Sequence, residues 1–372
     1  MIAGTSGTLA EVIGEMVVPD PKWRKQARAH LDNLTKPLGS LGRLEDIAAR
    51  FVAIRKGNPD LPLRKAAYVF AADHGIVAER VSAYPKEVTQ QMVLNFLEEG
   101  AAINVLARLH HAELTVVDVG VDADFGDLPG LLQRKVRPGT RNMLHEPAMT
   151  EDEMLGALQI GLELATGAQE KRQTLIAVGE MGIGNTTSAS VITAVLTGQP
   201  PALVTGKGTG LGKSAHEHKI RIVDAVIKKH FGQKHFGEKH SAKDLRISEA
   251  QPFEVLRCVG GLEIAAMVGL ILGAARYQIP VITDGFISTA AAAVADTIEP
   301  RVKEYLFAGH CSQEPGHRFL LEYLELDPIL TLEMRLGEGT GAVLAMPIIE
   351  SALRLYTDMA TFASAGVSGA SV

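Results

Sequence analysis

The chain has 372 residues, of which 46% are hydrophobic and 22% charged, and its formal net charge is −6. Such a composition predicts a large globular core, and the negative charge excludes a general attraction to nucleic acid or to anionic membranes. Two cysteines, Cys258 and Cys311, are too few for a disulfide framework and suit a reducing cytoplasm. The N-terminal stretch has no basic segment typical of a signal peptide, and the apolar stretch 259–275 contains Glu263 and is short for a membrane span.

The first sixty residues predict two helices joined by a turn rich in Pro and Gly at 36–42, with no strand. Further along the chain, apolar runs that end in polar residues or glycine predict strands at 66–71, 114–117, 175–178, 280–282 and 305–308. These runs are continuous rather than alternating, which is typical of strands that are covered on both faces.

Helical patterns separate the predicted strands, at 88–109, 154–165, 259–277 and 286–295, and a last helix is predicted at 342–359. The alternation of strands and helices predicts an α/β fold with a mainly parallel, Rossmann-like sheet covered by helices. We expect an α/β catalytic domain at residues 60–335. We also expect a small helical domain, formed by 1–59 and 336–372, that completes the active site.

Polar residues or glycine follow each predicted strand, at 73–75, 118–120, 179–180, 283–285 and 309–310. In parallel sheets, ligands bind outside the carboxyl ends of the strands. The five strand ends therefore predict one composite cleft. Within it, Asp73 and His74 fit either an acid–base pair or a hydrogen-bonded turn.

The segment 179–187 reads Gly-Glu-Met-Gly-Ile-Gly-Asn-Thr-Thr and lies between a predicted buried strand and a helix of small residues. Glycines at such a turn let backbone N–H groups approach a ligand, and the helix N-terminus favours an anion. The segment therefore predicts a cradle for a nucleotide or phosphate, with the carboxylate of Glu180 beside it.

A second glycine-rich segment, 206–214, superficially resembles a P-loop, but Lys207 stands where that motif requires glycine. The dinucleotide motif G-x-G-x-x-G is also absent in strict form, both here and at 182–184. Spacing leaves two interpretations open: a mobile loop, or a loop that closes on a substrate with Lys219 as a cation for phosphate.

The segment 336–341 places a lone carboxylate, Glu338, among glycines just before an apolar helix. Loss of water around a carboxylate raises its pKa and makes it a better general base near neutrality. A first-turn acid that favours the helix dipole is the alternative interpretation.

Histidine patterns do not predict a metal site. His216 and His218 are two residues apart rather than in H-E-x-x-H spacing, and no second Cys or His pair completes a site with His310, Cys311 and His317. The segment 228–243 spaces His230, His235 and His240 five residues apart, which favours a solvated linker.

Six segments together resemble the nicotinate-nucleotide–dimethylbenzimidazole phosphoribosyltransferases, enzymes of lower-ligand nucleotide assembly in cobalamin biosynthesis. They are 72–75, 81–85 with 88–90, 179–187, 283–286, 310–312 and 335–339, and the resemblance extends from about residue 31 to about 356. It implies transfer of phosphoribose from nicotinate mononucleotide to 5,6-dimethylbenzimidazole, with inversion at C1′, to give α-ribazole 5′-phosphate and nicotinate. It also implies a homodimer and no cofactor or metal, because the pyridinium ring is already a cationic leaving group.

By this resemblance Glu338 is the general base for the benzimidazole proton. Contacts to the aromatic base are implied for Ser82, Tyr84, Gln90 and Leu336. Contacts to the ribose and phosphate are implied for Glu180, Met181, Gly182, Lys219, Asp284, Gly285 and Ser312.

Three alternatives stay open on sequence alone. The acceptor could be another base, such as adenine, or a phenol. A nicotinamide-dinucleotide oxidoreductase is disfavoured by the failed G-x-G-x-x-G motif. A non-catalytic nucleotide-binding regulator is disfavoured by the two glycine-flanked carboxylates, because anion binding alone would disfavour acids in the pocket.

Overall fold

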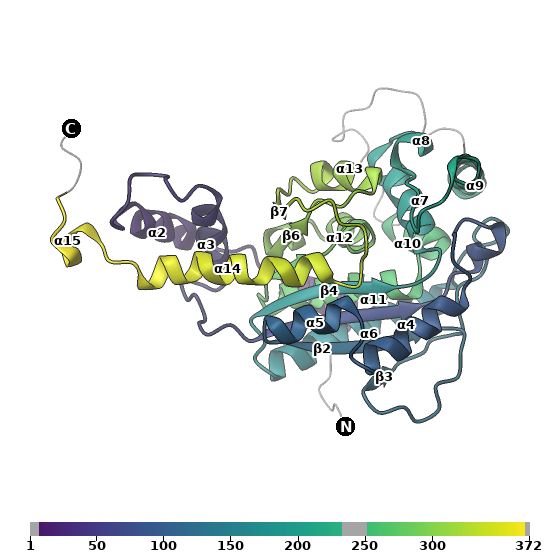
Figure 1. The fold of residues 1–372 in the computed structure, drawn as a ribbon, viewed down its shortest axis with the longest axis horizontal. Helices are drawn as coiled ribbons and strands as arrows, with labels where there is room; N and C mark the ends of the chain where they lie inside the picture. Colours follow the sequence, from purple (N-terminus) through teal and green to yellow (C-terminus); the bar gives the residue numbers. More distant parts are fainter. Residues whose placement is uncertain (1–6, 233–250, 369–372) are drawn as a thin grey trace.

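A parallel sheet forms the centre of the computed structural model, which describes residues 7–232 and 251–368 (Figure 1). Within these residues the sheet has seven strands in the order β3-β2-β1-β4-β5-β6-β7, and all neighbouring pairs are parallel. The strands are β1 (Lys65–Ala72), β2 (Ala112–Gly120), β3 (Leu131–Gln133), β4 (Leu175–Met181), β5 (Val281–Thr283), β6 (Leu306–His310) and β7 (Pro328–Leu330). The predicted parallel α/β fold is confirmed.

Helices cover both faces of the sheet because its central strands are apolar on both sides. One face carries α4 (Glu87–Leu97), α5 (Ala102–Leu109) and the start of α14 (Thr340–Asp358), and the other carries α11 (Leu262–Arg276) and α12 (Phe286–Ile298). The helix α6 (Glu151–Glu170) packs on α11. Every residue of β1 after Lys65 is buried, as expected for a doubly covered strand.

Further helices are inserted between β4 and β5 and between β6 and β7. The first insertion holds α7 (Asn185–Thr197), α8 (Pro201–Val204), α9 (Lys213–Phe231) and α10 (Gln251–Val259), and the second holds α13 (Pro315–Tyr323). Short 3₁₀ segments, Gly75–Glu79 and Pro300–Tyr305, follow β1 and α12. No helix in the described part of the chain is long and apolar enough to cross a membrane.

Helices from the N-terminal and C-terminal parts of the chain pack together beside the sheet. There α2 (Pro21–Asp32) packs on α3 (Arg43–Ile54), and α3 packs on α14, which runs out from the sheet toward them (Figure 1). Nε2 of His30 donates a 2.8 Å hydrogen bond to the Tyr356 carbonyl oxygen, and the Phe362 N–H donates to the Asn33 carbonyl oxygen. A short helix, α15 (Phe362–Ala365), follows.

The first helix, α1 (Leu9–Glu15), lies elsewhere. It packs on α11, and Glu15 forms a 2.6 Å ion pair with Arg276. Arg301 binds the carbonyl oxygens of Ile13 and Met16. The domain boundaries at residues 60–335, with 1–59 and 336–372 apart, stay a prediction.

The single helix predicted at 88–109 is wrong, because the structure has two helices there. Glu99 adopts a left-handed backbone (φ 59°), which an α-helix cannot continue through. The Asn104 side chain then accepts from the Ala101 N–H and donates to the Phe96 carbonyl oxygen, and so starts α5. The helix predicted at 259–277 begins only at Leu262, because Gly260 and Gly261 separate it from α10.

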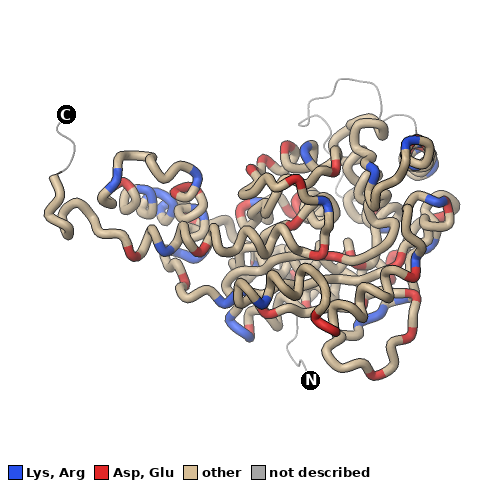
Figure 2. The backbone as a smooth tube through the Cα atoms, in the orientation of Figure 1, with Lys and Arg blue, Asp and Glu red and all other residues tan. Residues whose placement is uncertain are grey.

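The strands β3 and β7 were not predicted. Each has three residues, as β5 does, but β5 is fully buried whereas β3 and β7 are partly exposed and lack the continuous apolar run of a doubly covered strand. Figure 2 shows Lys and Arg interspersed with Asp and Glu over the described fold rather than gathered on one side.

The contact between α6 and α11 provides a test of the core. A Cβ added at Gly269 would overlap the carbonyl oxygen of Leu158 and lie 3.2 Å from the Gly161 Cα atom. We expect Gly269→Ala to force the helices apart and lower the free energy of unfolding by about 1–3 kcal/mol. Urea denaturation followed by circular dichroism measures this change.

The matched control is Gly167→Ala, also in a helix of this pair, where nothing lies within 4 Å of the added Cβ. That variant should be neutral or more stable by about 0.5–1 kcal/mol, because alanine favours helix over glycine. Equal effects of the two substitutions would contradict the close helix contact.

Candidate functional site

The site lies at the carboxyl ends of β1 and β4, where the strand order reverses direction. The β1 end carries Asp73 and His74, and the last residues of β4 include Glu180 and Met181. Ligands of open α/β sheets bind at such a switch point. The ends of β5 and β6 add Asp284 and Ser312 to the same edge.

Two glycine-flanked carboxylates meet there through close contact of their backbones. A Cβ added at Gly179 would lie 2.5 Å from the carbonyl carbon of Glu338, and one added at Gly337 would lie 2.5 Å from Oε1 of Glu180. Only glycine fits at both places. The glycines noted in the sequence therefore bring Glu180 and Glu338 to one location.

Both carboxyl groups are buried, and burial is the largest influence on the pKa of each. Glu180 is 6% exposed, and burial, with the negative charges of Asp284 and Glu263, raises its pKa to about 8. Asn185 opposes this shift by donating a hydrogen bond to Glu180 Oε2. Burial and the charge of Asp284 raise the pKa of Glu338 to about 7, while the Ile103 N–H lowers it.

Glu338 has the features of an available base. Its Oε2 is buried and has no hydrogen-bond partner among residues 7–232 and 251–368. Its backbone adopts a left-handed conformation (φ 64°) between Gly337 (φ 86°) and Gly339 (φ 87°). A residue other than glycine in the left-handed region of backbone conformation is usually held there by its surroundings.

A buried cation, Lys219, lies in the second turn of α9. Lys219 is fully buried, and its Nζ donates a 2.7 Å hydrogen bond to Oγ1 of Thr186, in the first turn of α7. Burial lowers the pKa of Lys219 to about 8, against the opposing effect of Glu314. Since Asn185 and Thr186 are consecutive, the first turn of α7 links Glu180 to Lys219.

The glycine-rich segment 206–212 lies over this lysine. A Cβ added at Gly208 would lie 3.1 Å from Lys219 Nζ, and Arg335 donates a 3.2 Å hydrogen bond to the Gly208 carbonyl oxygen. Farther along the loop, Thr209 Oγ1 lies 3.2 Å from Ser82 Oγ and accepts from the Ala83 N–H. The loop therefore connects the predicted phosphate cation with a predicted base-binding residue.

The remaining predicted base-binding residues lie at the surface. Tyr84 and Leu336 are 53% and 55% exposed, although both are large and apolar, and Gln90 is half-buried on α4. The Tyr84 N–H donates to Ser82 Oγ at 3.1 Å. These positions leave apolar surface free for a flat ring.

Asp284 and its neighbours form the base of the Glu338 turn. The carboxylate of Asp284 accepts hydrogen bonds from the N–H groups of Gly339, Gly341 and Ala342. A Cβ added at Gly285 would lie 3.3 Å from Nε2 of His310. The Ser312 N–H donates to Nδ1 of His317, and burial lowers the pKa of His317 to about 3, which keeps that ring neutral.

Asp73 and His74 do not pair with each other. Nε2 of His74 lies 2.5 Å from Oε1 of Glu263, and Asp73 accepts a hydrogen bond from the Asp122 N–H. A Cβ added at Gly182 would lie 3.3 Å from both His74 Cδ2 and Glu263 Oε1. The buried His74–Glu263 pair therefore borders the predicted cradle.

Sequence reasoning missed Glu263 and Glu314 as neighbours of the site. A signal was available for Glu263, since it is the one acid in the apolar helix pattern 262–275. Glu314 carried no signal of its own, because only the fold brings it to Lys219. Thr186 belongs to the predicted cradle 179–187, but its contact with Lys219 was not predicted.

The histidine patterns form no metal site in the part of the chain that the structure describes, where no group of three or more His, Cys, Asp or Glu is placed to hold a metal ion. His216 and His218 bind the carbonyl oxygens of Thr205 and Glu79. His230 binds the Met143 carbonyl oxygen, whereas His235 and His240 lie outside the described residues.

The raised pKa of Glu180 makes stability depend on pH. Its carboxyl stays protonated in the folded chain up to about pH 8, whereas in the unfolded chain it ionises near the ordinary value of 4.5. The free energy of unfolding therefore falls as pH rises between these values. We expect Glu180→Gln to have a higher melting temperature than the parent, by a margin that grows from about pH 5 to about pH 9.

Thermal melts across that pH range measure the margin. Glu322→Gln, which changes an exposed carboxylate on α13, is the control and should show a constant difference from the parent. A margin for Glu180→Gln that stays flat or shrinks with rising pH would contradict the burial argument.

Comparison with known proteins places the chain in a family. A family described as phosphoribosyltransferase matches residues 16–367. The nicotinate-nucleotide–dimethylbenzimidazole phosphoribosyltransferase of Geobacter metallireducens is 50% identical over 359 residues, which cover 96% of this chain and 98% of the relative. That of Geobacter sulfurreducens is 49% identical over 360 residues, 97% of this chain and 98% of the relative. The crystal structure of the Thermus thermophilus enzyme of this name superposes with a TM-score of 0.84 at 46% identity, covering 94% of this chain and 100% of that one. The chain therefore belongs to the family of nicotinate-nucleotide–dimethylbenzimidazole phosphoribosyltransferases.

Proposed function

We propose that the protein transfers the phosphoribosyl group of nicotinate mononucleotide to 5,6-dimethylbenzimidazole, with inversion at C1′. The products are α-ribazole 5′-phosphate and nicotinate, and the reaction serves cobalamin nucleotide-loop synthesis. The observation that carries this proposal is the pair of buried carboxyl groups, Glu180 and Glu338, packed together at the sheet's switch point. About 50% identity to enzymes of this name over nearly the whole chain supports it.

Glu338 is the proposed general base. One nitrogen of the benzimidazole attacks C1′ as the bond between C1′ and the pyridinium nitrogen breaks. The electron pair of that bond stays on the ring nitrogen, so nicotinate leaves with an uncharged ring. The ring nitrogen opposite the new bond then gives its proton to Glu338. A pKa of about 7 suits this transfer near neutrality, and the unpartnered Oε2 is free to accept the proton.

Glu180 is proposed to stabilise positive charge on the ribosyl group. The substrate ring is a cation, and positive charge passes through the sugar to the acceptor as the bond changes hands. A cation beside a buried carboxyl group favours its ionised form. With the cationic ring bound, Glu180 would ionise and, with Glu263 and Asp284 close enough to influence its pKa, supply negative potential on this edge of the sheet.

Lys219 is proposed to bind the 5′-phosphate. It is a fully buried cation hydrogen-bonded to Thr186 at a helix N-terminus, where backbone N–H groups also favour an anion. A phosphate would complement the lysine's charge through charge-assisted hydrogen bonds. Met181, Gly182, Gly285 and Ser312, which line the ends of β4, β5 and β6, are proposed to surround the ribose and phosphate.

The aromatic acceptor is proposed to bind near Ser82, Tyr84, Gln90 and Leu336. The two exposed apolar side chains in this set can cover a flat ring, and transfer of their surface from water would favour binding. Because Ser82 contacts Thr209, the glycine-rich loop would close over the bound ring.

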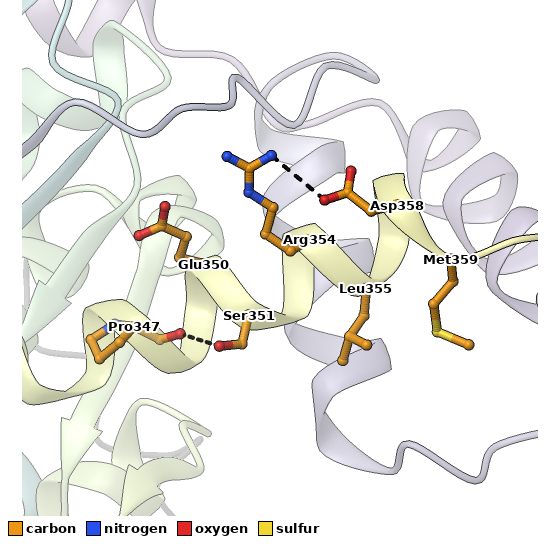
Figure 3. Close-up of a pocket in the computed structure, with 7 residues that line it drawn as sticks. All are labelled: Pro347, Glu350, Ser351, Arg354, Leu355, Asp358 and Met359. Atoms are coloured by element: carbon orange, nitrogen blue, oxygen red, sulfur yellow. Dashed lines mark hydrogen bonds and ion pairs between the residues drawn. The ribbon is translucent and has the colours of Figure 1, made fainter.

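A cytoplasmic homodimer is proposed as the working form. A hollow of about 640 Å³ lies along the C-terminal half of α14. Leu355 and Met359 line it and point to the same side of the helix (Figure 3). An open hollow with apolar side chains is typical of a protein–protein contact. Light scattering should give twice the chain mass of 39.7 kDa, and a value equal to one chain would contradict the homodimer.

The direct test is to incubate the protein with nicotinate mononucleotide and dimethylbenzimidazole and to separate the products by chromatography. We expect α-ribazole phosphate and nicotinate in equal amounts. Adenine and a phenol, offered in competition, test the acceptor. Absence of product with every acceptor at high enzyme concentration would reject the proposed transfer.

Two variants separate chemistry from binding. Glu338→Gln removes the proton acceptor but keeps the shape, so kcat should fall about 10²–10⁴-fold with nearly unchanged KM for both substrates. Lys219→Met keeps length and burial but removes the cation, so its main effect should be a raised KM for nicotinate mononucleotide. Parental kcat in Glu338→Gln would exclude Glu338 as the base.

A further inference from the structure

Asp284 is placed so that it cannot serve as an open ligand. It follows β5 directly and is 1% exposed. Its Oδ2 accepts a hydrogen bond from the Gly339 N–H at 3.1 Å, and its Oδ1 accepts from the N–H groups of Gly341 at 2.6 Å and Ala342 at 3.2 Å. Both oxygens of the carboxylate are thus bound to the start of α14.

The start of α14 depends on this distant carboxylate. Its N-cap residue is Gly339, which provides no side chain to cap the helix. The first N–H groups of a helix lack intrahelical acceptors and need a partner when they are buried. Asp284 provides it from 55 residues upstream, where its negative charge also suits the helix dipole.

The bond to Gly339 also constrains the residue before it. Residues 337–339 are three successive left-handed residues, and Glu338 is the one among them with a side chain. A non-glycine residue in this conformation is strained and persists only if its surroundings hold it. Asp284 accepts from the N–H of the Glu338–Gly339 peptide, and Gly179 packs closely against the same peptide.

Asp284 is itself fixed in place. Its backbone N–H donates a 2.9 Å hydrogen bond to Oγ of buried Ser288, and Nε2 of His310 lies 3.5 Å from Oδ1. The ring of His310 packs against Gly341, where an added Cβ would overlap it. The end of β5 therefore forms a rigid platform beneath the Glu338 turn.

We propose that Asp284 is a positioning residue that holds Glu338 in its catalytic conformation through the first turn of α14, rather than a ligand of ribose or phosphate. This inference rests on the proposed role of Glu338. Asp284 also acts through its charge, since it is one of the influences that raise the pKa of both Glu338 and Glu180.

The test variant is Asp284→Asn, which keeps size and one oxygen acceptor but turns an N–H group toward the Gly339 N–H. We expect kcat to fall about 10²-fold, the loss typical of a catalytic group displaced by about 1 Å, with KM for nicotinate mononucleotide changed less than twofold. Without the charge of Asp284 the pKa of Glu338 falls, so the acid limb of the kcat/KM profile should shift to lower pH.

A second readout needs no turnover. Hydrogen exchange of the peptide that contains residues 337–346 should be faster in Asp284→Asn than in the parent. Asp296→Asn, on α12 outside the site, changes a half-buried aspartate and is the matched control, with parental exchange at 337–346 and parental kinetics. Ser288→Ala keeps the charge but loosens the platform, so it should lower kcat several-fold without moving the acid limb.

The outcomes separate the inference from the proposed function. A raised KM for nicotinate mononucleotide with an unmoved acid limb and unchanged exchange at 337–346 would show that Asp284 is a substrate ligand. Lower stability with parental kcat would reduce it to a structural cap. If the parent protein itself forms no product, the proposed function fails, whereas the exchange experiment still decides whether Asp284 holds the turn.

Discussion

The contact between the backbones of residues 179–180 and 337–339 is the constraint on which the site depends. It exists because Gly179 and Gly337 lack side chains, so that the end of a central strand and the turn before α14 can touch. Without it, two acidic side chains from segments 158 residues apart in the sequence would be separated by ordinary side-chain packing. The same contact excludes water from both carboxyl groups, and burial then dominates their ionisation.

Such a site is costly for a folded protein. Burial destabilises the ionised form of a carboxyl group that has no matching cation. The pKa values of Glu180 and Glu338 are therefore raised well above the ordinary value. The rest of the edge is arranged to tolerate them: backbone N–H groups occupy Asp284, and an amide donor serves Glu180. A cationic substrate would stabilise the ionised carboxyl groups, and this attraction would favour its binding.

Much of the fold could be predicted from the sequence, because doubly covered strands and their crossover helices have strong apolar patterns. The parallel sheet and its five longer or more apolar strands followed from those patterns. The break after α4 and the strands β3 and β7 did not, because they depend on one left-handed residue and on pairing of three-residue segments. Local sequence carries little information about either.

The sequence offered candidate residues for the site but not their arrangement. Glycine flanks marked Glu180 and Glu338, yet nothing in the sequence indicated that the two flanks touch. Asp284 was expected near the ribose and phosphate, whereas its oxygens bind the first turn of α14. Glu263 stood out as a lone acid in an apolar helix, but its contact with His74, like the place of Glu314 beside Lys219, depends on long-range packing.

The helix α14 connects the terminal segments to the site, so that a movement of those segments would be transmitted to Glu338. Its 19 residues make a rod about 28 Å long, fixed at one end beside Glu338 and at the other by α3 and the His30 contact with Tyr356. A tilt of about 4° about the end that contacts α3 would displace the end beside Glu338 by about 2 Å, which is enough to misalign a general base. Pro347, which cannot donate a backbone hydrogen bond, is the point where this rod bends most easily.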